Sequence, residues 1–296
     1  MSGYKTFAVA GAGGLGKFVV EALLAKKNEG TISSVSILSR SSSGHDDLVA
    51  KGAKVIVVDY SSSSSIKSAV AGVDVVVSTL SGSPLGPQLG LATGAKAAGV
   101  KLFVPSEFGN ATDGATEGFW GEKDAFKKKL KNEIHLPYAA FYTGGFTDFI
   151  FQKGLAEVVG FDFTNGKITV PGEGTSPISW TTRRDIGRFV AHVLTQLPKE
   201  KLEWRIFQIE GDRTSFNQIS EDYKARSSKN VSVAHRPRSE LEEKLKKDPS
   251  DGFTAVLLSW DKGQGASGKP EELANSEFPQ WKPKKVIDVI FEIYGN

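Results

Sequence analysis

Short apolar runs alternate with amphipathic segments through the first half of the chain. The runs are rich in valine, isoleucine and leucine, and between them apolar residues recur at helical spacing. Continuous apolar strands that alternate with helices are typical of a parallel sheet covered on both faces. We therefore predict an α/β fold with a doubly wound parallel sheet. Its strands are expected at residues 7–11, 35–38, 54–58, 73–78, 101–104 and 138–142, with helices at 17–27, 46–51, 65–71 and 88–98.

The second half of the chain is less regular. Longer polar stretches separate its apolar segments, and a glycine-rich loop at residues 262–269 is a candidate mobile cover over a site. Apolar residues share one face of an amphipathic helix predicted at residues 183–194. The other predicted elements are a strand and turn at 166–174, a strand at 204–209, and helices at 216–226, 240–245 and 283–294.

A glycine-rich turn joins the first predicted strand to the helix that follows it. Gly11, Gly13 and Gly16 form the pattern G-x-G-x-x-G, which also contains Gly14 and Leu15. The first glycine permits a sharp turn, the second lets the backbone approach a pyrophosphate, and the third allows the helix to pack closely on the strand. The unpaired N–H groups of the helix then attract the phosphates. The pattern predicts dinucleotide binding; the alternative is a turn with a purely structural role.

The residues after the second predicted strand indicate which dinucleotide is bound. A carboxylate at this place normally accepts a hydrogen bond from the ribose 2′-hydroxyl of NAD. Here the strand leads into Arg40 and Ser41, and no acidic residue comes before Asp46. A guanidinium offers paired donors suited to a 2′-phosphate, so we expect NADP(H) to be preferred over NAD(H). The alternative is that Arg40 is a solvated surface residue.

Small, polar and aromatic residues follow the later strands, where the ligand of such a sheet binds. Those expected to contact the cofactor there are Thr79, Leu80, Ser106, Glu107, Phe108, Gly145 and Phe146. Glu107 could equally pair with a basic side chain. Aromatic residues form either the wall of a substrate pocket or part of the core. The candidates are Trp120, Phe146, Phe149, Phe151 and Trp260.

Composition narrows the class of protein. The 296 residues carry 37 basic and 34 acidic side chains, a net charge of +3 that does not by itself argue for nucleic-acid binding. The absence of cysteine excludes disulfides and thiolate chemistry. The four histidines are scattered, so no metal site is expected. No apolar run approaches the ~20 residues of a membrane helix and no signal peptide is recognised, so we expect a soluble, cytoplasmic protein.

Several segments together resemble one known family. Residues 98–109 end in V-P-S-E-F-G, and the glycine motif lies at residues 11–20. With further matches at 52–55, 71–78, 136–138, 184–187 and 278–281, the chain is similar to the NmrA-like, isoflavone-reductase-like branch of the atypical short-chain dehydrogenases. The resemblance spans nearly the whole chain and thins after residue 215.

The resemblance implies a Rossmann domain, which we place at residues 1–150, and a smaller α+β substrate-binding domain, which we place at residues 151–296. The helix at 183–194 is expected to pack back on the first domain. The family's reductases use NADPH and act on aromatic compounds such as isoflavones, lignan-like ethers and quinones. We therefore expect an NADPH-dependent reductase of a small aromatic substrate, as a monomer or homodimer. The alternative is a regulator that senses NADP(H) without turnover and acts through a protein partner, as other members of the family do.

The family also carries a lysine at the start of the helix after V-P-S-E-F-G. Five lysines occur in this part of the chain, at positions 123, 127, 128, 129 and 131. None of the tyrosines has a lysine four residues later, so the tyrosine acid of ordinary short-chain dehydrogenases is absent. An inward lysine would orient the nicotinamide and donate a proton or stabilise an oxyanion. As a third alternative, the lysines form a stripe that contacts nucleic acid.

Helical phase separates the five lysines. The buried face of the helix is defined by Phe126, Leu130 and Ile134. At about 100° per residue, Lys123 shares that face, whereas Lys127 and Lys129 flank it. The spacing to Pro137 also favours Lys123. We predict that Lys123 is the catalytic lysine, with Lys129 or no catalytic lysine as the alternatives.

Overall fold

The computed structural model describes residues 1–82 and 86–295. Its first half contains a five-stranded parallel sheet in the order β3-β2-β1-β4-β5. In the centre of the sheet, Val9 is paired with Ile37 on one side and with Val77 on the other. The predicted doubly wound parallel sheet is confirmed. The strands are β1 (Thr6–Ala10), β2 (Ser34–Ser39), β3 (Lys54–Val57), β4 (Val75–Ser78) and β5 (Leu102–Val104).

Two further strands extend this sheet. A bridge between Phe103 and Tyr138 places β6 (Ala139–Tyr142) beside β5, and the Phe103 N–H donates to the carbonyl of Pro137 at 2.8 Å. Parallel to β6 runs β11 (Arg205–Gln208), which comes from the second half of the chain. The sheet edge is therefore completed by a strand distant in sequence.

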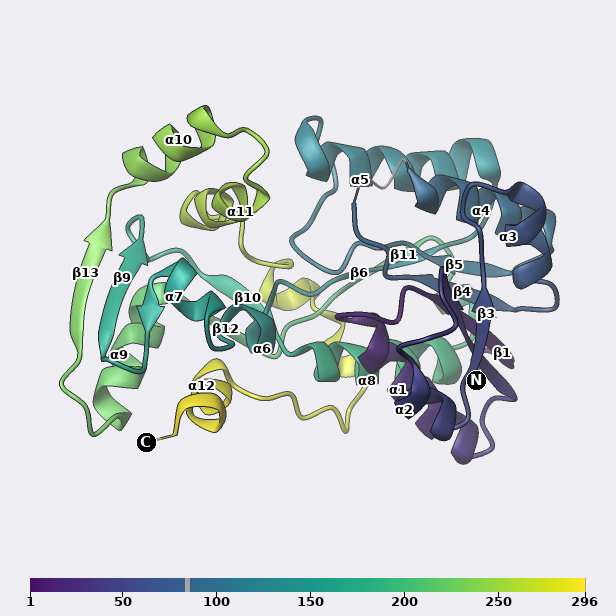
Figure 1. Cartoon of the computed structure of the whole chain (residues 1–296), viewed down its shortest axis with the longest axis horizontal. Coiled ribbons are helices and arrows are strands. Elements are labelled where there is room, and N and C mark those ends of the chain that lie inside the picture. Colours follow the sequence, from purple (N-terminus) through teal and green to yellow (C-terminus); the bar gives the residue numbers. More distant parts are fainter. Residues whose placement is uncertain (83–85, 296) are drawn as a thin grey trace.

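Helices cover both faces of the sheet (Figure 1). On one side lie α1 (Gly16–Asn28), α2 (Asp46–Ala50) and α8 (Arg183–Gln196), packed on the large side chains Phe7 and Val9 of β1. On the other side lie α3 (Ser63–Ala69), α4 (Pro87–Ala97) and α5 (Gly118–Lys129), packed on Ala8 and Ala10. Alternation of side chains along β1 gives each helix layer its own apolar core.

Helix α5 continues directly into a π-helical turn, η1 (Leu130–Ile134), which ends at His135 in the left-handed conformation. Phe126 and Leu130 are buried as predicted. The prediction that Lys127 flanks the buried face is wrong, because Lys127 is also buried. Lys128 is exposed and Lys129 is partly exposed. The five lysines therefore do not form one surface stripe.

The second half of the chain builds a separate aromatic core. It contains a sheet in the order β13-β9-β8 and another in the order β12-β10-β7. The side chains that fill it include Phe151, Phe161 and Trp180. Its strands are β7 (Gly145–Phe146), β8 (Phe161–Asp162), β9 (Lys167–Pro171), β10 (Ile178–Thr181), β12 (Asp212–Thr214) and β13 (Ser232–Arg236). Its helices are α6 (Thr147–Ile150), α7 (Leu155–Val159), α9 (Phe216–Arg226) and α12 (Val286–Tyr294).

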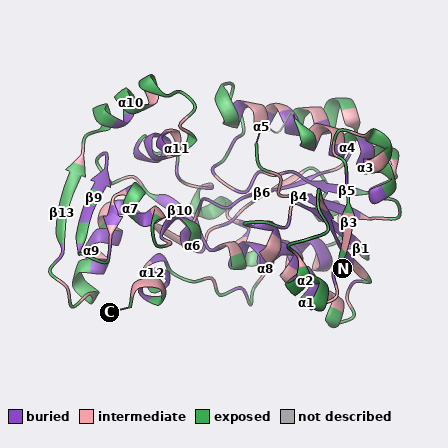
Figure 2. Cartoon of the chain, viewed as in Figure 1, coloured by how far each residue is buried: buried purple, intermediate pink, exposed green. Residues whose placement is uncertain are grey.

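A helical hairpin of α10 (Arg238–Lys247) and α11 (Gly252–Asp261) projects from β13. Most of α10 is exposed and only Leu241 is buried, whereas α11 is largely covered (Figure 2). The sequence analysis did not predict α11. The remaining short helices are 3-10 turns at Lys199–Lys201, Pro270–Glu272 and Ala274–Glu277. Within residues 1–82 and 86–295, no helix has both the length and the apolar character to cross a membrane.

Candidate active site

The glycine-rich loop lies between β1 and α1 at the carboxyl edge of the sheet. A Cβ atom on Gly13 would meet no described atom within 4 Å, so the backbone there faces open space. A Cβ on Gly16 would lie 1.9 Å from the carbonyl oxygen of Gly11. Gly16 therefore permits close packing of α1 on the turn, and Gly13 has open space beside it where the motif would place a phosphate.

A groove of about 590 Å³ runs from this loop across the ends of the strands. All residues predicted to bind the cofactor line it except Gly16, Ser41 and Gly145. The Ser41 hydroxyl instead pairs with that of Ser43 at 2.8 Å. The predicted residues along the groove are Gly11, Gly13, Gly14, Leu15, Arg40, Thr79, Leu80, Ser106, Glu107, Phe108 and Phe146.

At one end of the groove, Arg40 shares the lining with His45 and Tyr60. The Tyr60 hydroxyl donates to the Leu38 carbonyl at 3.0 Å, and burial raises the pKa of Tyr60 to about 12 against the opposing charge of Arg40. The His45 Nε2 atom lies 3.1 Å from the Ser39 hydroxyl. Sequence reasoning missed His45 and Tyr60 because neither belongs to a motif, and only the fold brings Tyr60 to Arg40.

Lys123 lies at the other end of the groove. The residue is 9% exposed, and its Nζ atom donates to the backbone carbonyl of Glu107 and lies 4.7 Å from the ring centre of Phe119. Loss of hydration on burial lowers the pKa of Lys123 to about 8; the Glu107 carboxylate opposes this shift and the neighbouring Lys127 adds to it. The ammonium is therefore held in a buried position, and it loses its proton at a lower pH than an ordinary lysine does.

A buried polar network supports this end of the groove. Lys127 pairs with the Glu107 carboxylate at 3.1 Å and also donates to the Thr112 hydroxyl. Thr112 donates to the second oxygen of Glu107 at 3.0 Å and lies 3.1 Å from the Tyr142 hydroxyl. The Glu107 carboxylate is thus paired with Lys127, and pairing with a basic side chain is the alternative noted from the sequence. The Glu107 carbonyl accepts a hydrogen bond from Lys123. Phe108, the next residue, has a φ of +31°, a strained backbone conformation of the kind found at functional sites.

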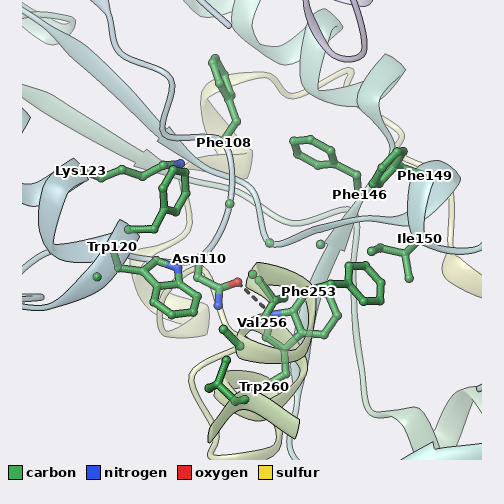
Figure 3. A pocket seen from close by; sticks show the side chains of 18 of the residues that line it. Phe108, Asn110, Trp120, Lys123, Phe146, Phe149, Ile150, Phe253, Val256 and Trp260 are labelled. Atoms are coloured by element: carbon green, nitrogen blue, oxygen red, sulfur yellow. Dashed lines mark hydrogen bonds between the residues drawn. The ribbon is translucent and has the colours of Figure 1, made fainter. Parts of the chain in front are cut away.

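A second hollow, of about 820 Å³, opens beside Lys123 (Figure 3). Its wall is mostly aromatic and aliphatic, and Lys123 is the only charged side chain among its described lining residues. Trp120, Phe146, Phe149 and Trp260 line it as predicted for a substrate pocket. Phe151 does not, because it is fully buried in the aromatic core.

The groove and the apolar cavity meet. The residues common to both linings are Phe108, Phe119, Lys123 and Phe146. Gly145, absent from the groove lining, lines the cavity just beyond this junction. A ligand along the groove and a ligand in the cavity would therefore contact each other next to the Lys123 ammonium.

The cover over the cavity comes from the helical hairpin rather than from residues 262–269. Leu245, Phe253, Val256 and Trp260 of α10 and α11 contribute to the lining, whereas none of residues 262–269 does. In Figure 3 the α11 side chains face Lys123 and Trp120 of α5 across the cavity. The glycine-rich loop therefore does not cover this cavity, and its Gly265 packs against Ile178 and Trp260 instead.

The sheet order, the glycine loop and the groove along the strand ends define a protein with the Rossmann fold. The chain belongs to the NmrA-like family, whose model matches residues 4–261. This match confirms the resemblance seen in the sequence.

The relatives of this chain include proteins named as oxidoreductases and reductases. Oxidoreductase BOA1 of Botryotinia fuckeliana is 35% identical over 224 residues, which is 71% of this chain and 71% of the relative. Phenylcoumaran benzylic ether reductase TP7 of Nicotiana tabacum is 27% identical over 263 residues, which is 83% of this chain and 82% of the relative. The chain is thus similar to enzymes from both fungi and plants.

Solved structures share the fold along the whole chain. A structure described as AtPrR2 with NADP+ and (+)pinoresinol matches with a TM-score of 0.80 at 20% identity, covering 99% of this chain and 100% of that chain. The binary complex of leucoanthocyanidin reductase with NADPH from Vitis vinifera matches with a TM-score of 0.78 at 18% identity, covering 98% and 100%. Both structural neighbours are described with NADP(H) bound.

Proposed function

We propose that this protein is an NADPH-dependent reductase of a small, uncharged aromatic compound. The observation that carries the proposal is the junction of the groove and the apolar cavity at Lys123. A dinucleotide groove that opens into a second site is what a reductase needs to bring its two reactants together. The names of the relatives, which include oxidoreductases and benzylic ether reductases, support the same class of reaction.

The groove fits NADP(H). The open space at Gly13 leaves room for the pyrophosphate, and Arg40 lines the groove with its guanidinium available for a 2′-phosphate. Bound NADPH would supply hydride to an electron-poor carbon of an enone, a quinone or a benzylic ether. Arg40→Ala is expected to remove most of a preference for NADPH over NADH, at least about tenfold in Kd, while leaving NADH binding nearly unchanged. Equal wild-type affinity for the two cofactors would show that Arg40 does not bind the phosphate.

Lys123 would supply the proton or the positive charge that the reaction needs. Its ammonium is held at the junction by the Glu107 carbonyl, and its pKa of about 8 leaves it largely protonated at neutral pH. A cation fixed in an apolar site stabilises negative charge that develops on a substrate oxygen.

The lining of the cavity suggests the substrate class. Aromatic side chains from α5, α6 and α11 surround the space, and such walls bind flat, apolar ring systems. A substrate with its own charge would find a single, already hydrogen-bonded ammonium and no carboxylate among the described lining residues. The proposal is therefore an uncharged compound with one or more aromatic rings and a reducible centre beside an oxygen.

NADPH oxidation measured with a quinone, an enone and a benzylic aryl ether tests this function. We expect turnover with at least one class and none with charged analogues of similar size. Tight NADPH binding without turnover on any class would contradict the reductase and favour a regulator that senses NADP(H).

A further inference from the structure

Arg183, the first residue of α8, faces the glycine-rich loop from the second half of the chain. Its Nη1 atom is 3.8 Å from the position that a Cβ would occupy on Gly14. Among the described residues beyond the loop itself, no other atom comes within 4 Å of that position. The guanidinium therefore lies next to the backbone that the motif assigns to the pyrophosphate.

Three neighbours fix the side chain of Arg183. Its Nε atom donates to the Asp148 carboxylate at 2.9 Å, and its backbone N–H donates to the other oxygen of that group at 2.8 Å. The guanidinium carbon lies 5.5 Å from the ring centre of Phe18 and 5.4 Å from that of Phe149. With 18% of its side chain exposed, the group is held in one orientation before any ligand arrives.

The terminal nitrogens of this guanidinium have no acceptor among the described residues, because Asp148 takes only the Nε hydrogen. An arginine carries five N–H donors, so four remain for a ligand. Paired donors on a planar cation match phosphate oxygens in geometry and charge. We propose that Arg183, which comes from the second half of the chain, binds the pyrophosphate of the dinucleotide beside Gly14; this inference rests on the proposed NADPH function.

Phe149 links the Arg183 guanidinium to the apolar cavity. The ring packs on the Arg183 guanidinium and also lines the apolar cavity. An arginine bound to the pyrophosphate would hold that part of the cavity wall in place. The phosphate site and the cavity thus share one side-chain stack.

Isothermal titration of purified protein with NADPH, NADH and 2′-AMP tests the assignment without requiring activity. Arg183→Gln is expected to weaken NADPH and NADH by the same factor, about 10- to 100-fold, the range for a lost charge-assisted hydrogen bond. Binding of 2′-AMP, which lacks the pyrophosphate, should stay unchanged. The matched control is Arg184→Gln, because Arg184 is the exposed neighbour on the same turn. This variant should bind all three ligands as the wild-type protein does. Arg40→Ala should show the opposite pattern, a loss for NADPH and 2′-AMP only.

Two results would overturn the assignment: wild-type affinity of Arg183→Gln for both cofactors, or a loss confined to NADPH. If thermal melting shows that Arg183→Gln does not fold, Arg183→Lys replaces it, because a lysine keeps the charge toward Asp148 but offers no planar fork. That variant should also weaken both cofactors equally, and unchanged affinity would again contradict the proposal. Normal binding without turnover in the wild type would affect only the proposed reductase function.

Discussion

Lys123 and Lys127 lie one helical turn apart, and each of them binds a different part of Glu107. Lys123 donates to the backbone of Glu107, while Lys127 neutralises its carboxylate. A buried carboxylate without that partner would attract the Lys123 ammonium away from the junction, since unlike charges interact strongly where water is excluded. The pairing of Glu107 with Lys127 therefore leaves Lys123 available to the cavity.

Replacement of Lys123 should separate chemistry from binding. Lys123→Ala is expected to lower turnover by about 10²-fold or more, the usual contribution of one positioned proton donor. NADPH affinity should fall only modestly, because contacts with the phosphates provide most of it. The control is Lys129→Ala, because Lys129 pairs with Glu133 on the surface at 2.8 Å and should keep turnover within a few-fold of wild type. Equal activity in the two variants would leave the chain without a catalytic lysine.

The lowered pKa of Lys123 gives a pH dependence of definite sign. If the Lys123 ammonium is the proton donor of the proposed reaction, the donor is lost as the pH rises through about 8, whereas an ordinary lysine would stay charged well above that pH. The kcat/KM of the reductase should therefore decline above about pH 8. In Lys123→Arg the decline should vanish, since arginine stays charged throughout. A decline that persists in that variant would assign it to another group.

The loop between β1 and α1 acts as one element, because its conformation alone determines where phosphates approach. Gly13→Val adds a branched side chain in the open space beside the backbone. We expect NADPH binding to disappear while circular dichroism and thermal melting remain those of wild type, because no described atom lies within 4 Å of the new Cβ. Retained affinity would show that the phosphates bind elsewhere.

Helices and strands of the first half could be predicted from sequence because each carries its own signal. Continuous valine runs indicated buried strands, and the glycine motif identified the turn. Helix α11 carried no such signal: its sequence is apolar around most of its circumference, so it lacks the periodicity that reveals an amphipathic helix. The prediction for Lys127 was wrong because helical phase alone cannot reveal that the buried Glu107 carboxylate lies next to this side chain.

The two halves of the molecule are joined through α8, which packs along α1. A Cβ on Gly187 would lie 2.5 Å from the carbonyl oxygen of Phe18, so the two helix backbones approach as closely as glycine allows. Trp281, from the end of the chain, donates to the Asp185 carbonyl at 3.1 Å and packs in the same core. The division of the chain at residue 150 stays a prediction, and elements from both sides of it share this core.

Gly187→Ala tests the contact between α1 and α8. The added methyl group must push α8 away from α1, and overpacking of this kind typically costs about 1–3 kcal/mol in the free energy of unfolding. Gly252→Ala is the control, because a Cβ there meets nothing within 4 Å, and its stability should stay close to that of wild type. Urea denaturation of both variants measures the difference. Equal stability of the two variants would mean that the helices can move apart without lowering the free energy of unfolding.

The helical hairpin contributes its share of the cavity wall from one unbroken stretch of chain, residues 245–260, whereas the groove is built from the ends of many strands. Evolution can therefore alter what the cavity admits by changing a single short segment, while the machinery that holds the cofactor stays untouched. An exchange of this segment between relatives would change the part of the cavity wall that it forms and leave the groove as it is.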